Sequence, residues 1–324
     1  MVPLITTDVD ESKTAVIINL NNIASITVLI LVLFIIPCAS DARTINTAVL
    51  YPEAAHPYSQ VFSTIIDGIR TQTQINVKSY EITDKTRGDD VKKWLDANPA
   101  DMLIVLGQKS FDVIANMNFS IPSIVSAVIR PVEPHRCICL SIAPEELIEH
   151  LLKIKPEVKR IFFVYSDKNN GWMLPDANAA AKKAGVQLIA KSAENIQEAA
   201  LQYKSILNNK LGPTDAIWLP LDNILPSDVI LPDILKSAWD NKYVIFSTSP
   251  FYVKRGGLFA LFPDHYKLGQ QIAELASQAN NTMPERYSHA RHYKSTLNVR
   301  TARHIGMHIS NEGIKQYDIV YPLR

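Results

Sequence analysis

The chain of 324 residues lacks several features that would assign it to a class at once. Three cysteines are too few for a disulfide framework, so the fold does not depend on one. A formal charge of +1 leaves no electrostatic footprint for nucleic acid, and no block of like charge suggests a polybasic membrane patch. Hydrophobic residues make up 47% of the chain and charged residues 20%, which is enough to bury a full core and excludes disorder.

Catalytic signatures are also missing. The sequence has no G-x-S-x-G elbow, no Walker A motif, no G-x-G-x-x-G and no H-E-x-x-H. It therefore predicts no catalytic residue, and we expect a protein that is not an enzyme. Two histidine pairs, His289 with His292 and His304 with His308, raise a metal hypothesis, but Gly306 disfavours a shared helical face for the second pair. We expect surface histidines, no metal and no cofactor.

A long apolar segment is missing as well. The only extended run, Ile23–Ile36, is shorter than the about 20 residues of a membrane-spanning helix and suits the apolar region of a secretory signal. Small residues before Arg43 predict cleavage after Ala42 and a periplasmic or extracytoplasmic protein. The n-region is more acidic than such signals are, so an uncleaved anchor is the alternative. A lipoprotein modified at Cys38 is a third, disfavoured because Pro37 precedes the cysteine.

The two remaining cysteines, Cys137 and Cys139, lie in the apolar run CICLSI, which reads as a strand. Residues two apart on a strand share a face at roughly 6.5 Å, and a local disulfide would distort the pleat. We interpret both as small core residues.

Apolar strands alternate with helical patterns through the rest of the chain. Near-continuous apolar runs such as MLIVLG (Met102–Gly107) and RIFFVY (Arg160–Tyr165) predict parallel strands that are covered on both faces. The β-α-β order restarts at CICLSI. The sequence therefore predicts an α/β fold with two Rossmann-like lobes built on parallel sheets.

Polar or small residues follow five of these strands. Ligands of open α/β sheets bind outside the carboxyl ends of the strands, although such residues can also simply cap the next helix. We expect Asp222, directly after the run DAIWLP, to contact a ligand's amino group, with loop stabilisation as the alternative. The other ligand contacts predicted from the strand ends, together with two aromatic side chains for an apolar part, are Tyr58, Ser59, Gln108, Ser110, Asn170, Trp172, Ser247 and Ser249.

Four segments resemble one family in order and spacing. They are FSTSPFYVKRGGLFALFPDHYKLGQQIAELA (Phe246–Ala276), KRIFFVYSDKNNGWMLPDANAAAKKAG, TDAIWLPLDN and STLNVRTARHIGMHIS. They are similar to the tryptophan/tyrosine-type substrate-binding proteins of bacterial ABC transporters. The resemblance covers most of the chain after the leader and adds Asp264, in the D-Y-x-x-L-G-like segment, to the expected ligand contacts.

The resemblance implies a type I periplasmic-binding-protein (Venus-flytrap) architecture, with two lobes, three crossovers and a cleft. The implied division is residues 1–42 as leader or anchor, 43–129 plus 249–284 as one lobe, and 130–248 plus 285–324 as the other. The implied function is capture of a small molecule and delivery to an ABC permease and its ATPase, by a protein that we expect to be a monomer without nucleic-acid partners. A membrane-anchored ligand sensor is the alternative.

One departure bears on the ligand. The glycine-rich stretch that the family has after the fourth strand is replaced here by RPVEPHRC (Arg130–Cys137), which is short and basic. An aromatic amino acid therefore cannot be assumed as the ligand. The sequence leaves its identity open, with an amino acid or a related compound as one possibility.

Overall fold

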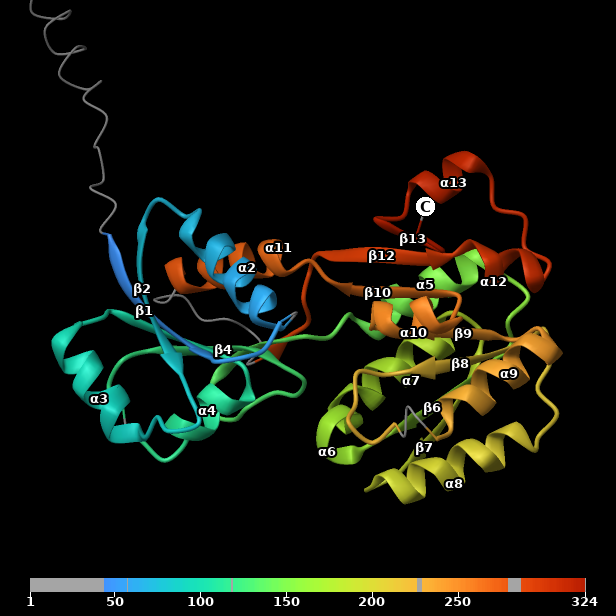
Figure 1. Cartoon of the computed structure of the whole chain (residues 1–324), viewed down its shortest axis with the longest axis horizontal. Coiled ribbons are helices and arrows are strands. Elements are labelled where there is room, and N and C mark those ends of the chain that lie inside the picture. Colours follow the sequence, from blue (N-terminus) through green and yellow to red (C-terminus); the bar gives the residue numbers. More distant parts are fainter. Residues whose placement is uncertain (1–43, 57, 118, 226–228, 279–286, 324) are drawn as a thin grey trace, which may run out of the picture. The chain divides into compact units, whose positions relative to one another are not determined.

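Two sheets of mostly parallel strands organise the chain (Figure 1). The computed structural model describes residues 44–56, 58–117, 119–225, 229–278 and 287–323. The predicted leader of residues 1–42 lies outside this part of the chain. Among the described helices, none is both long and apolar enough to cross a membrane.

The first lobe contains a six-stranded sheet in the order β11-β5-β4-β3-β1-β2, with every pair parallel. Its central strand β3 is buried along its whole length, as the unbroken apolar run predicts. Its strands are β1 (Ile45–Pro52), β2 (Ile75–Ile82), β3 (Met102–Leu106), β4 (Ser123–Val128), β5 (Arg136–Cys139) and β11 (Tyr287–Ser288). Its helices are α2 (Tyr58–Arg70), α3 (Gly88–Ala97), α4 (Gln108–Ile114) and α11 (His265–Ser277).

The second lobe contains a seven-stranded sheet in the order β13-β12-β10-β9-β8-β6-β7, in which only the β10–β12 pair is antiparallel. Its strands are β6 (Arg160–Tyr165), β7 (Gln187–Ser192), β8 (Asp215–Leu219), β9 (Val244–Ser247), β10 (Phe259–Pro263), β12 (Tyr293–Asn298) and β13 (Ile319–Tyr321). Its helical segments are α5 (Pro144–Ile154), α6 (Asp167–Asn170), the 3₁₀ turn η1 (Gly171–Met173), α7 (Leu174–Lys183), α8 (Ile196–Leu207), α9 (Leu231–Asn241), α10 (Pro250–Arg255), α12 (Val299–His304) and α13 (Asn311–Lys315).

The chain passes between the lobes three times, after β5, after β10 and after β11. Hydrogen bonds join these passages to one another. Ser141 Oγ lies 2.7 Å from His289 Nδ1, and the Ala290 N–H donates to the Ser141 carbonyl at 3.0 Å. The Asp264 N–H donates to the His292 carbonyl, also at 3.0 Å. The lobes are therefore connected by three adjacent, mutually bonded segments.

Strand pairing shifts the lobe boundaries from the expected ones. Strand β5 pairs with β4 in the first sheet, although residues from 130 onward were assigned to the second lobe. Strand β10 pairs with β9 in the second sheet, although 249–284 was assigned to the first. Strand β11 belongs to the first sheet and not to the second lobe. Each crossover begins after the last residue of a strand. The strand before the crossover therefore still belongs to the lobe whose sheet it pairs with.

Cys137 and Cys139 are free and buried on β5, with their sulfur atoms 3.6 Å apart. The contact between the two thiols and their burial raise the pKa of Cys139. The interpretation of both as core residues is confirmed.

Helices α2 and α11 of the first lobe cross at a pair of glycines (Figure 1). A Cβ on Gly68 would lie 2.0 Å from the Tyr266 carbonyl oxygen, and one on Gly269 would lie 2.1 Å from the Ile65 carbonyl oxygen. Neither backbone oxygen can rotate away, so a side chain at either position must separate the helices.

We predict that Gly68→Ala lowers the free energy of unfolding by about 1–3 kcal/mol, the usual cost of overpacking. Urea unfolding measures this. Gly212→Ala is the matched control, because a Cβ on Gly212 would meet no atom within 4 Å, and it should change stability little. If Gly68→Ala and the wild type unfold at the same urea concentration, helices α2 and α11 can separate without loss of stability.

His150 on α5 gives a second prediction. Its Nε2 lies 3.0 Å from the Tyr317 hydroxyl, and burial, with a smaller contribution from Lys153, lowers its pKa from 6.5 to about 4. Between these values the unfolded chain takes up a proton that the folded chain does not, so stability falls as pH falls from 6.5 to 4. The loss from this group is up to about 3 kcal/mol. His150→Gln should reduce the difference in unfolding free energy between pH 7 and pH 4. An unchanged difference would contradict this assignment.

Candidate functional site

A cleft of about 560 Å³ opens at the carboxyl ends of strands from both sheets. This is where an open α/β sheet places its ligand, and the volume falls in the range of small-molecule sites. The cleft is lined by Gln108, Asp112, Ala127, Val128, Ile129, Arg130 and Leu140 from the first lobe and by Lys168, Asn169, Leu221 and Asn223 from the second. A smaller hollow shares Ile129, Leu140 and Leu221 with it and reaches Asn170 and Thr248.

The turn from β3 into α4 forms one part of the first wall. Gly107 has φ +79°, and a Cβ there would lie 3.1 Å from Pro52, so this turn requires glycine. The turn brings Gln108 to the cleft, where its Nε2 donates to Asp112 Oδ1 at 2.7 Å. Ser110 points the other way: it is fully buried, and its hydroxyl has no hydrogen-bond partner in the described chain.

The end of β4 forms the other part of the first wall. The pairing of β4 with β5 shifts register between Ser126 and Val128, and Ala127 has φ +56°. Such bulges redirect the side chains that follow them, and left-handed non-glycine residues often mark functional sites. The bulge is held by Ser126 Oγ, which donates to the Ile138 carbonyl at 2.7 Å. The residues that follow, through Arg130, line the cleft.

Asp222 organises the second wall. Its Oδ2 accepts from the Ser166 backbone N–H at 3.0 Å and from Asn170 Nδ2 at 2.7 Å, while Oδ1 accepts from Asn169 Nδ2 at 2.9 Å. Asn169 Nδ2 also donates to Asn223 Oδ1 at 2.9 Å. One carboxylate thus connects the loops after β6 and β8 and fixes the two asparagines at the cleft.

The other predicted contacts have clear local roles. Ser247 is buried and donates to the Leu219 carbonyl at 2.7 Å, and Asp264 caps α11 through the Tyr266 and Lys267 N–H groups. Trp172 Nε1 donates to the Asn169 carbonyl at 3.0 Å, and its ring stacks on His289. Ser249 begins α10, and Tyr58 and Ser59 are exposed at the start of α2. None of these six side chains lines the cleft, so their contact with a ligand stays a prediction.

Of the predicted residues, Gln108 lines the cleft and Asn170 the adjoining hollow, with Asp222 bonded directly behind them on the second wall. The cleft is also lined by residues that are not among the contacts predicted from the sequence: Asp112, Arg130, Lys168, Asn169 and Asn223. Asn169 and Asn223 belong to the polar segments that follow the strands in the sequence, next to the predicted contacts Asn170 and Asp222. Asp112 lies one helical turn after Gln108, and that spacing was a usable signal.

The histidines lie in separate local contacts. Within the described ranges no three His, Cys, Asp or Glu side chains gather to hold a metal ion. His289 contacts Ser141 and Trp172, and His304 stacks on Trp239 and lies 2.8 Å from its carbonyl oxygen.

The family model of the ABC transporter substrate binding proteins matches residues 140–318, more than half of the chain. Among solved structures, an ABC domain from Streptococcus pneumoniae in complex with L-Trp is 21% identical, covers 86% of this chain and 99% of its own, and has a TM-score of 0.57. The open, ligand-free Clostridium difficile protein CD0873, a substrate binding protein with adhesive properties, is 16% identical, with coverages of 85% and 99% and a TM-score of 0.61.

At these identities the structural likeness establishes the type I periplasmic-binding-protein fold. Comparison with curated proteins found no match. The family match is decisive: the chain belongs to the ABC transporter substrate binding proteins. It is a solute-binding protein of a family that acts by binding and, in general, outside the cytoplasm, and the match does not favour the alternative of an anchored sensor.

The network around Asp222 generates a prediction about stability. Asp222→Ala leaves the Ser166 N–H without its acceptor and the buried Asn170 amide with only the Leu221 carbonyl at 3.3 Å. The free energy of unfolding should therefore fall by about 1–3 kcal/mol. Asn223→Ala is the control, because Asn223 is exposed and accepts a single hydrogen bond there, and it should cost less than about 1 kcal/mol. Chemical denaturation of the solute-free protein measures both. If Asp222→Ala leaves stability unchanged and weakens solute binding, the residue is a ligand contact instead.

Proposed function

We propose that this protein acts outside the cytoplasm. It captures a small solute in the cleft between its two lobes and delivers it to an ABC permease in the membrane. The observation that carries the proposal is that polar side chains from both lobes line one cleft: Gln108 and Asp112 on one wall, Asn169 and Asn223 on the other. A solute that bonds to both walls stabilises a conformation in which they are close.

The three bonded crossovers supply the hinge for such a motion. Hinge closure around a ligand absorbs its backbone changes in a few residues at the ends of elements. The segments after β5, β10 and β11 are short, adjacent and tied by the Ser141–His289 and Asp264–His292 contacts. We infer that the lobes move as rigid bodies about these segments. Gln108 and Asn170 are the contacts we retain from the strand-end prediction.

The proposal extends to location and partners. The apolar run Ile23–Ile36 supports export and removal of the leader near Ala42, which would release a monomer to a permease with its ATPase. L-tryptophan is the ligand named for the pneumococcal relative, and amino acids are therefore among the first solutes to test here.

The test is a thermal-shift screen of the protein against amino acids, small carboxylates, sugars, nucleosides and phosphates. A solute at 100 times its dissociation constant stabilises the folded protein by about 2.7 kcal/mol. Gln108→Ala and Asn223→Ala should reduce the shift of a stabilising solute, whereas Gln187→Ala, an exposed residue of β7 outside the cleft, should leave it intact.

Small-angle scattering on the same samples tests closure. The radius of gyration should fall when the solute is added. The proposal fails if no solute in the screen stabilises the protein, or if a stabilising solute binds the two cleft variants as tightly as the wild type.

A further inference from the structure

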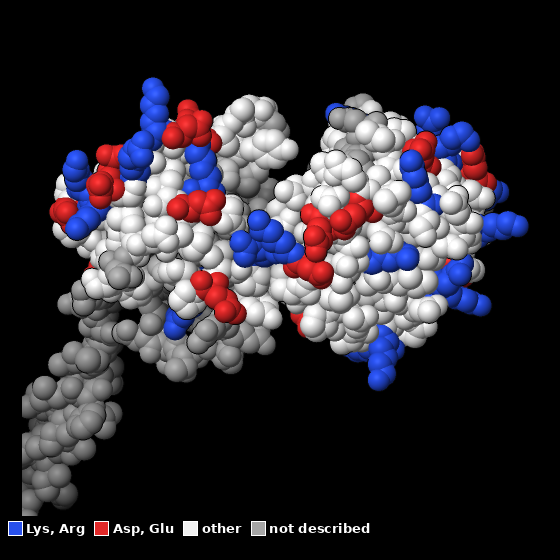
Figure 2. Space-filling model, turned by 90° about the horizontal axis from the view of Figure 1, so that it is seen from below, with Lys and Arg blue, Asp and Glu red and all other residues white. Residues whose placement is uncertain are grey.

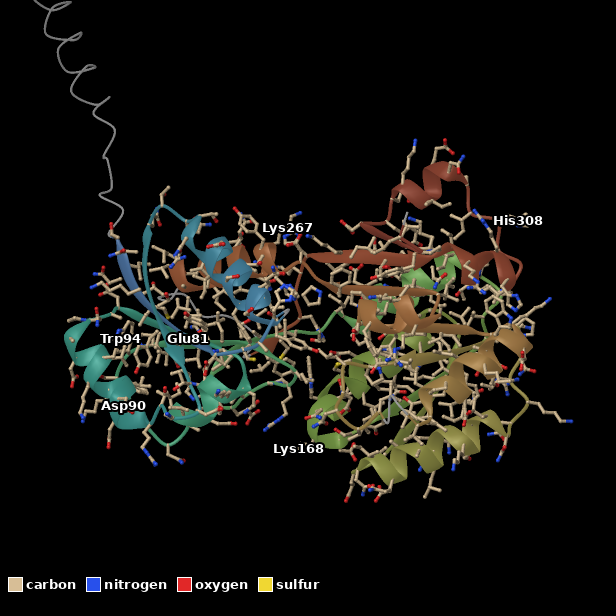
Figure 3. The ribbon with its side chains drawn as sticks, in the orientation of Figure 1. Glu81, Asp90, Trp94, Lys168, Lys267 and His308 are labelled. Atoms are coloured by element: carbon tan, nitrogen blue, oxygen red, sulfur yellow. The ribbon has the colours of Figure 1, made fainter. Side chains whose placement is uncertain are left out.

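Two basic side chains face the cleft from opposite lobes. Arg130 follows the bulge at the end of β4, and Lys168 lies on α6 after β6. Figure 2 shows basic and acidic side chains next to each other at the junction of the lobes, and Figure 3 shows Lys168 at the side of the second lobe that faces the first. Each wall of the cleft therefore contributes one cation.

Neither cation forms an ion pair with a described residue. No ion pair or hydrogen bond joins the side chain of Arg130 or Lys168 to the rest of the described chain. Lys109, beside the cleft, differs in this respect, because its Nζ lies 2.6 Å from Asp84 Oδ1. Asp112, the acidic residue among those lining the cleft, accepts from Gln108 at 2.7 Å and pairs with neither cation.

The backbone holds Arg130 in this position. The left-handed Ala127 and the register shift beside it set the direction in which the chain leaves β4. A straight end of β4 would continue the alternation of side chains along the strand, whereas the bulge changes that alternation just before the cleft. The unusual backbone thus lies next to the arginine that lines the cleft.

We propose that the solute is a small organic anion, and that its carboxylate or phosphate group bridges Arg130 of the first lobe and Lys168 of the second. This inference rests on the proposed solute-binding function. The arginine fork binds two oxygens of such a group in its plane, while the lysine ammonium acts as a point charge from the other side.

The two cations also couple the charge of the solute to closure of the cleft. Two like charges repel as the walls approach, and the repulsion grows as water leaves the cleft. An anion between them converts this repulsion into two attractions. The empty cleft is therefore biased toward the open form, and an anionic solute favours the closed one.

The probes are matched pairs that differ in the anionic group: phenylacetate with phenylacetamide, succinate with succinamide, adenosine 5′-monophosphate with adenosine, and ribose 5-phosphate with ribose. Calorimetry and thermal shift on the wild type should show binding by an anionic member and none by its neutral partner. The first two pairs test a carboxylate and the last two a phosphate.

Arg130→Gln and Lys168→Gln should each weaken binding of that anion at least tenfold, while Arg130→Lys and Lys168→Arg retain part of it. Arg303→Gln and Lys182→Gln, exposed residues outside the cleft, are the matched controls and should bind as the wild type does. Since neither cleft cation has a partner within the described chain, the melting temperature without solute should not change.

The outcomes separate the two proposals. Binding of a neutral solute with no anionic member bound, or wild-type affinity in both glutamine variants, overturns the anion inference and leaves solute capture standing. Absence of any stabilising solute, neutral or anionic, in the wider screen as well overturns both.

Discussion

Parallel pairing is the constraint on which the cleft depends. In each sheet the strands next to the cleft run the same way, so the loops that follow them emerge at one edge. Any polar group in these loops must find a partner or face solvent, because a buried unpaired group is costly. The chain meets this demand on the second wall with a single carboxylate. Asp222, in the loop after β8, accepts hydrogen bonds from three groups of the loop after β6 and so joins the two loops. A ligand can bond to those donors and acceptors of the wall that do not already form hydrogen bonds in the network around Asp222.

The connection between the lobes depends on a different kind of interaction. Backbone and side-chain hydrogen bonds join the three crossovers, and His289 takes part twice, through Ser141 and through its stacking on Trp172. Trp172 in turn donates to the Asn169 carbonyl, beside the cleft. The hinge and the second wall are thus in direct contact, so a change at Asn169 can reach the crossovers through one tryptophan ring.

The sequence predicts the sheets well and the cleft only in part, for identifiable reasons. Apolar runs such as Met102–Leu106 mark buried strands whatever their neighbours are, and the structure confirms them as parallel strands. Sheet membership of β5 and β10 escapes this reasoning because periodicity carries no information about pairing partners. Ser110 shows the same limit at the level of one side chain: it follows a strand as Gln108 does, but the helical turn of α4 rotates it into the core. Arg130 lines the cleft beside Ala127, whose backbone is left-handed. Alanine rarely adopts this conformation, so the sequence does not predict it.

The resemblance implies a glycine-rich stretch after the fourth strand, and residues 129–137 of this chain contain no glycine. Glycine after a strand lets a ligand approach the backbone closely, and a ligand held in that way is recognised by N–H groups of fixed position. In this chain the same place carries Ile129 and Arg130, whose side chains occupy the wall instead. In the binding mode that we propose, recognition there depends on the Arg130 side chain, and selectivity depends on charge. In that binding mode the arginine after β4 and the lysine on α6 act as one anion-binding site that is divided between the two lobes.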